Sequence, residues 1–82
     1  MGMSSSELYQ FTDAVIQKLR EAGLDPHPLE LVQSTAFTTG SEWLGELGWA
    51  VRKIEEHDVQ VENLKKDLEA ILREVHKVWP NI

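Results

Sequence analysis

The chain has 82 residues, no cysteine and a formal net charge of −6 at pH 7, with 41% hydrophobic residues. The length fits one small domain with an ordinary core, and the lack of cysteine excludes disulfides, a thiolate nucleophile and a cysteine-ligated zinc site. Because neither half of the chain is basic, the charge argues against binding to nucleic acid or to an anionic membrane surface.

No apolar run approaches the length that spans a bilayer, and no secretory signal peptide is recognised. We therefore expect a cytoplasmic protein with a single helical domain over residues 1–82 and a flexible leader at residues 1–5. The leader matches the acceptor pattern for N-myristoylation at Gly2, but no basic cluster follows that would strengthen membrane attachment. A serine-rich start to the first helix accounts for the same residues.

Residues 4–23 have the pattern of a first helix. Ser4 and Glu7 match a capping box, and Gly23 supplies a left-handed residue after the last turn. The apolar stripe of this helix contains Leu8, Phe11, Val15, Leu19 and Ala22.

A stiff connector, Asp25-Pro26-His27-Pro28, follows the first helix. Proline is compatible with the first turn of a helix, so a short second helix is predicted over residues 29–35. Its buried side should contain Leu29, Val32 and Ala36.

A long third helix is predicted from residue 41 to residue 79. Thr39 and Glu42 match a second capping box, and Pro80 marks the end. Its apolar residues follow a heptad in one frame. The inner positions are Trp43, Leu47, Ala50, Ile54, His57, Val61, Leu64, Leu68, Ile71, Val75, Val78 and Ile82.

Two glycines, Gly45 and Gly48, lie inside this predicted helix, and each costs about 1 kcal/mol relative to alanine. We interpret them as a place of close packing, with Phe11 or Phe37 from the first or second helix above them.

An alternative splits the long helix near His57-Asp58 into an antiparallel hairpin, which gives a four-helix bundle. Asp58 could cap a new helix there. A tight turn usually contains Gly, Pro or Asn, and residues 55–60 contain none, so the continuous helix is favoured.

A continuous helix over residues 41–79 would be nearly 60 Å long at about 1.5 Å per residue, and the first helix would cover less than half of it. The uncovered seam predicts self-association through the C-terminal helix, most simply as a homodimer. The expected interface contains Ile54, His57, Val61, Leu64, Leu68, Ile71, Val75, Val78 and Trp79.

Little in the sequence indicates chemistry. His27, His57 and His76 lack the helical spacing of a metal site, and the loop hydroxyls have no linked base. No phosphate-binding loop is present, so we expect neither an enzyme nor a cofactor. Trp49 points away from the seam; it either packs under the amino-terminal helices, which is favoured, or stands exposed as a candidate partner-binding residue.

The sequence therefore predicts an acidic all-α protein that acts as a non-enzymatic protein–protein interaction module, such as an adaptor, chaperone-like or assembly subunit. The alternative is an acidic inhibitor of a basic effector protein, of the immunity or antitoxin kind.

Overall fold

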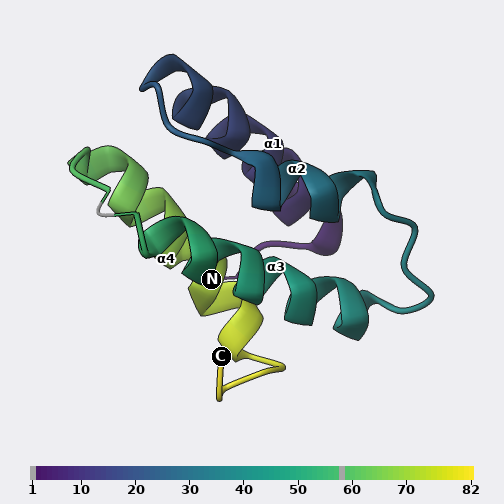
Figure 1. The fold of residues 1–82 in the computed structure, drawn as a ribbon. Coiled ribbons are helices and arrows are strands. Elements are labelled where there is room, and N and C mark those ends of the chain that lie inside the picture. Colours follow the sequence, from purple (N-terminus) through teal and green to yellow (C-terminus); the bar gives the residue numbers. More distant parts are fainter. Residues whose placement is uncertain (1, 58) are drawn as a thin grey trace.

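The computed structural model describes residues 2–57 and 59–82, and this part of the chain is all-helical. The helices are α1 (Ser5–Glu21), α2 (His27–Ser34), α3 (Gly40–Glu55) and α4 (Glu62–His76). Figure 1 shows them folded back on one another, and the principal extents of the chain are 32 × 24 × 21 Å. The predicted all-α class is confirmed.

Local sequence chemistry sets the ends of α1 as predicted. The Ser4 hydroxyl accepts a hydrogen bond from the Glu7 N–H at 3.1 Å, and the Glu7 carboxylate accepts one from the Ser4 N–H at 2.9 Å. Gly23 follows the helix with a φ of 75°, a left-handed conformation that favours glycine. The chain can therefore turn sharply after α1 and lead into α2.

Helix α2 begins directly after Pro26, with a proline in its first turn. Leu29 and Val32 are buried, as expected, whereas Ala36 lies beyond the end of the helix and is exposed. Thr39 then caps α3, because its hydroxyl accepts a hydrogen bond from the Glu42 N–H at 3.1 Å.

The continuous helix predicted over residues 41–79 is not confirmed. Helix α3 ends at Glu55, α4 begins at Glu62, and α4 returns alongside α3 (Figure 1). The break lies beside His57, the one polar residue among the predicted inner positions. The capping role expected for Asp58 falls on a residue outside the described ranges, and the N-cap of α4 is Val61, without a side-chain hydrogen bond.

Burial of the apolar seam explains why the chain turns where no Gly, Pro or Asn marks a turn. The helical hydrogen bonds lost where a helix breaks are worth only about 0.5–1.5 kcal/mol each in net terms. Each large apolar side chain moved from water into a core contributes roughly 1.5–3 kcal/mol. The reversal brings several such side chains of α4 into contact with the rest of the molecule, so tertiary packing outweighs local helix propensity.

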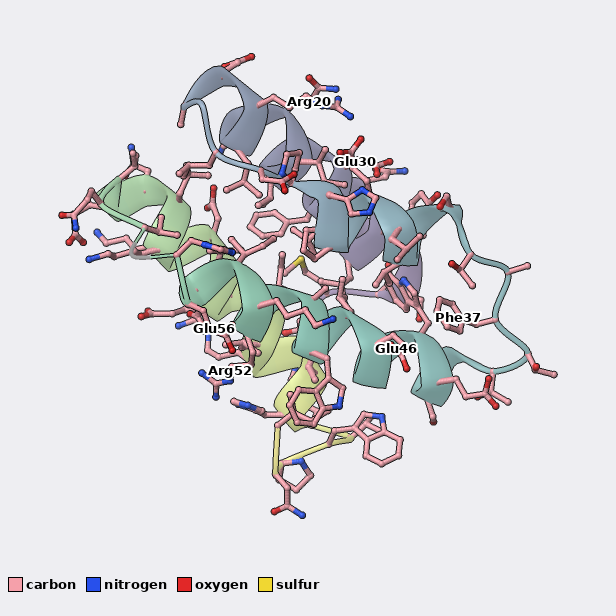
Figure 2. All side chains as sticks on the ribbon, in the orientation of Figure 1. Arg20, Glu30, Phe37, Glu46, Arg52 and Glu56 are labelled. Carbon is pink, nitrogen blue, oxygen red and sulfur yellow. The ribbon has the colours of Figure 1, made fainter. Side chains whose placement is uncertain are left out.

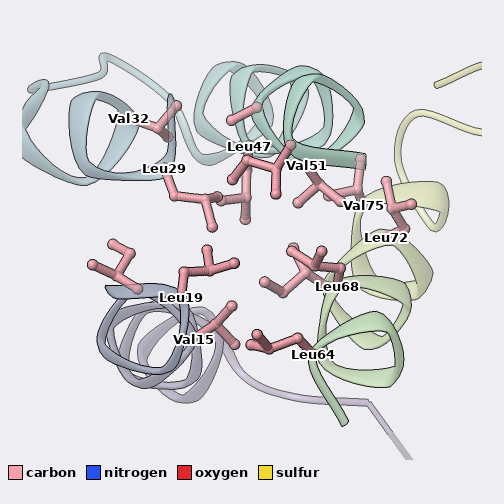
Figure 3. Packing of buried hydrophobic residues seen from close by; sticks show 14 of the residues in the cluster. Val15, Leu19, Leu29, Val32, Leu47, Val51, Leu64, Leu68, Leu72 and Val75 are labelled. Atoms are coloured by element: carbon pink, nitrogen blue, oxygen red, sulfur yellow. The ribbon is translucent and has the colours of Figure 1, made fainter. Parts of the chain in front are cut away.

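The core lies between the four helices, because α1 packs on α2 and α4, while α3 packs on α2 and α4. Figure 3 shows side chains from all four helices meeting at the centre. The fully buried large apolar residues are Val15, Leu19, Leu29, Leu47, Val51, Leu68, Ile71 and Val75. No helix in the described ranges is long and apolar enough to cross a membrane.

Part of the leader expected at residues 1–5 is held against this bundle. The Met3 N–H donates a hydrogen bond to Glu74 Oε1 at 2.9 Å, and the Met3 side chain packs against the core. Ser4 caps α1, and Ser5 is its first residue.

Candidate protein-interaction site

The residues predicted to form a self-association seam divide into two groups. The buried group belongs to the core of the single chain and contains Ile54, Leu64, Leu68, Ile71 and Val75. The exposed group lies at the two ends of α4 or beyond them and contains His57, Val61, Val78 and Trp79. The seam that motivated the homodimer is therefore used mostly within one molecule.

Trp49 is 57% exposed on α3, so the favoured expectation that it packs under the amino-terminal helices is wrong. Trp79, which follows α4, is 42% exposed. Both line one surface hollow of about 370 Å³, which we call the tryptophan groove. Its lining residues are Phe37, Glu42, Gly45, Glu46, Trp49, Trp79 and Ile82.

The groove is assembled from two parts of the chain that are distant in sequence. The Trp79 indole Nε1 donates a hydrogen bond to the Ser41 carbonyl oxygen at 2.7 Å, which fixes the ring against the start of α3. Arg52 Nε donates to the Ile82 carbonyl oxygen at 2.9 Å, which holds the last residue against the later part of α3. The segment after α4 thus forms one wall and α3 forms the other.

The two α3 glycines explain how closely these walls approach. A Cβ atom at Gly45 would lie 3.4 Å from Nε1 of Trp79, and one at Gly48 would lie 2.8 Å from both Val75 and Ile82. Close packing over the glycines is therefore confirmed, but α4 and the segment after it supply the neighbour. The expectation that Phe11 or Phe37 covers them is wrong, although Phe37 lines the groove nearby.

Two carboxylates give the groove its electrostatic character. Glu42 and Glu46 are exposed, and within residues 2–57 and 59–82 neither forms an ion pair. Figure 2 shows Phe37 and Glu46 toward the start of α3, with Arg52 and Glu56 toward its end. Arg52 is already engaged, because its Nη1 lies 3.2 Å from Glu55 Oε1.

A second hollow, of about 500 Å³, lies between the start of α1, the end of α2 and the start of α3. Hydrogen bonds join lining residues from the three helices. Trp43 Nε1 donates to Gln33 Oε1 at 3.2 Å, and Gln33 Nε2 donates to the Tyr9 carbonyl oxygen at 3.0 Å. This network ties three helices together, which gives these residues a structural role.

The residues considered for chemistry are dispersed. His57 is exposed in the turn after α3, so it is not the inward-facing histidine that the heptad implied. Among the described residues, no group of three His, Asp or Glu side chains could hold a metal ion. The hydroxyls of Ser34 and Thr35 donate to the Leu31 carbonyl oxygen, and that of Thr39 caps α3, so these loop hydroxyls bond to the backbone.

Sequence reasoning identified Trp49 but did not bring Glu46, Trp79 and Ile82 together with it in one groove. The available signal was the spacing of Gly45, Gly48 and Trp49, which places small residues and an indole close together on α3. Comparison with protein-family models, with curated proteins and with solved structures finds no match to this chain. The case for a function therefore depends on the groove itself.

Proposed function

We propose that the protein is a non-enzymatic protein–protein interaction module that binds a partner through the tryptophan groove. The observation that carries the proposal is the exposure of two tryptophans, Trp49 and Trp79, in one hollow. Tryptophan is enriched among the residues that contribute most to binding at protein interfaces. A large indole contributes little to folding stability while it is exposed to water, because it does not gain the energy of burial in a core. Burial against a partner protein would supply that energy and so accounts for the exposed pair.

The groove suits a protein partner for a second reason. Its walls are held in place by the hydrogen bonds of Trp79 and Arg52. A surface that is fixed before binding loses less conformational entropy when the partner docks. The homodimer predicted from the sequence remains one form of this proposal, with the partner then being a second copy bound at the exposed residues.

Site-specific photocrosslinking tests the proposal. A photoreactive benzoylphenylalanine would replace Trp49 in one variant and Leu31 in a control, because Leu31 on α2 is also 57% exposed. We expect position 49 to crosslink to a discrete partner in a lysate of the source cells and position 31 to give no such product. Trp79→Ala should reduce the crosslink at position 49.

Equal crosslinking at positions 49 and 31 would contradict a specific site in the groove. A product with the mass of two chains would assign the partner as a second copy and support the predicted homodimer. A product with a different protein would support a heterologous interaction.

The second candidate function, an inhibitor of a basic effector, is favoured by the net charge of −6 and by Glu42 and Glu46 in the groove, for which the described residues supply no ion pair. Opposite charge accelerates encounter with a basic protein and contributes to specificity. The test is whether the crosslinked partner is basic and loses its own activity when the purified protein is added.

A further inference from the structure

We infer that the tryptophan groove binds an arginine side chain from a basic segment of the partner protein. The inference rests on the proposed function, because it names the chemistry that this interaction surface recognises. It is carried by the combination in one hollow of two indole rings and two carboxylates, which form no ion pair with the described part of the chain.

The aromatic rings supply the first part of the recognition. Trp49 and Trp79 both line the groove and both keep a large part of their surface exposed. A cation placed over the face of an indole is attracted by the ring quadrupole, and tryptophan is the strongest of the aromatic residues in this interaction. An apolar side chain would also contact the rings, so the rings alone do not fix the ligand.

The carboxylates in the groove favour a cationic ligand over an apolar one. Glu42 and Glu46 line the same hollow as the two indoles and are one helical turn apart on α3. An apolar ligand would remove water from these carboxylates without compensation, which is unfavourable, whereas a cation would pair with them. Arg52, which lies further along α3, is paired with Glu55 and with the Ile82 carbonyl oxygen.

Arginine fits this combination better than lysine does. Its planar guanidinium can stack on an indole while its N–H groups donate two parallel hydrogen bonds to a carboxylate. The ammonium of lysine is a more strongly hydrated point charge and loses more on leaving water. The volume of about 370 Å³ lies at the low end of the range for ligand pockets and would hold one or two side chains of an extended segment.

The test uses the full chain and a short peptide of alternating arginine and glycine. Lysine and citrulline versions of the peptide separate stacking from charge, because citrulline keeps the planar group and loses the charge. We expect the arginine peptide to shift the indole N–H signals of Trp49 and Trp79 in a ¹⁵N-labelled sample. The signal of Trp43, which donates to Gln33, should stay in place.

The matched variants are the pair Glu42→Gln/Glu46→Gln in the groove and the pair Glu21→Gln/Glu69→Gln on exposed positions of α1 and α4. Both pairs remove the same charge. We expect the groove pair to weaken binding of the arginine peptide about tenfold, which corresponds to about 1.4 kcal/mol, and the control pair to weaken it much less.

Equal weakening by the two pairs, or binding of the citrulline or lysine peptide as tightly as the arginine peptide, would overturn the inference. Absence of peptide binding together with a specific crosslink at position 49 would overturn the arginine assignment and leave the proposed interaction function standing. Absence of both would contradict the interaction function as well.

Discussion

At the scale of single residues, Gly48 is the point where α3 has no room for a side chain. A Cβ atom there would lie 2.8 Å from a methyl carbon of Val75, which is fully buried and branched at Cβ, so the neighbour cannot simply rotate away. Gly45 is different, because its nearest neighbour would be 3.4 Å away, an ordinary contact.

Alanine substitutions at the two glycines should therefore change the free energy of unfolding in opposite directions. Alanine favours the helix by about 1 kcal/mol at either position. Overpacking costs about 1–3 kcal/mol, which should make Gly48→Ala destabilising by about 1 kcal/mol. We expect Gly45→Ala to raise the free energy of unfolding slightly, and urea denaturation measures both variants. A stabilising Gly48→Ala would contradict the close contact with Val75.

The Glu74 carboxylate should make the folding stability depend on pH. The Lys77 ammonium, which donates to both carboxylate oxygens, and the Met3 N–H hold the pKa of Glu74 below its ordinary value of 4.5. Because the folded pKa is the lower one, the carboxylate contributes stability above the unfolded pKa, and this contribution is lost as the pH falls through the folded pKa. Glu74→Gln should therefore destabilise at about pH 7 and have a smaller effect at about pH 3, because the Glu74 carboxylate loses charge as the pH falls.

Urea denaturation at the two pH values checks this, with Glu69→Gln on the exposed side of α4 as the control. An equal effect of Glu74→Gln at both pH values would show that the ionised carboxylate contributes no stability.

At the scale of elements, the connector between α3 and α4 determines the architecture. Val59 is 3% exposed and packs in the core, whereas Val61 two residues later is 44% exposed. The connector is thus anchored by one apolar side chain that the heptad frame did not include. This anchor helps to hold α4 against α3 in place of a conventional turn residue.

Two matched substitutions test this anchor. Val59→Ala should lower the free energy of unfolding by about 1–3 kcal/mol, because it leaves a cavity under the connector. Val61→Ala should change it by less than about 0.5 kcal/mol, since surface substitutions usually have small effects. Thermal denaturation of the two variants gives the comparison, and similar losses would argue against a buried Val59.

Both ends of α1 and the start of α3 could be predicted because residues next to one another in sequence determine them. Ser4 with Glu7, Gly23, and Thr39 with Glu42 each satisfy or redirect the backbone locally. The break of the predicted long helix into α3 and α4 could not be predicted in this way. It depends on α4 gaining contacts with residues far away in sequence. The local signs of it were the polar His57 at an inner position and Asp58 as a candidate cap.

At the scale of the whole molecule, the apolar seam that seemed to require a second copy is largely satisfied within one chain. The same long-range packing made the groove hard to predict. The sequence of α3 alone indicated Trp49 as a candidate partner-binding residue. Its neighbour Trp79 lies beside it only because α4 reverses direction and the segment after α4 returns to Ser41.

The mass in solution tests the predicted homodimer. We expect the mass of one chain, 9.4 kDa, at low micromolar concentration, because Leu64, Leu68 and Ile71 are buried in the chain's own core. Light scattering after size exclusion measures it, and twice that mass would restore self-association through the remaining exposed residues.

Leu68→Asp should then unfold the chain, because it places an unpaired charge at a fully buried position. Circular dichroism would show the loss of helix, and Leu31→Asp at an exposed position of α2 is the control. A folded Leu68→Asp variant of normal mass would contradict the packing of α4.

The bond between the Trp79 indole and the Ser41 carbonyl oxygen joins residues that are 38 positions apart. A binding surface built from such distant residues exists only in the folded state. A ligand that binds it therefore stabilises the folded state against unfolding. At a free concentration of 100 dissociation constants, the gain would be about 2.7 kcal/mol. For a domain of this size that corresponds to a melting temperature higher by roughly 10–20 °C. Calorimetric screening of cellular fractions could therefore detect the unknown binder before anyone has isolated it.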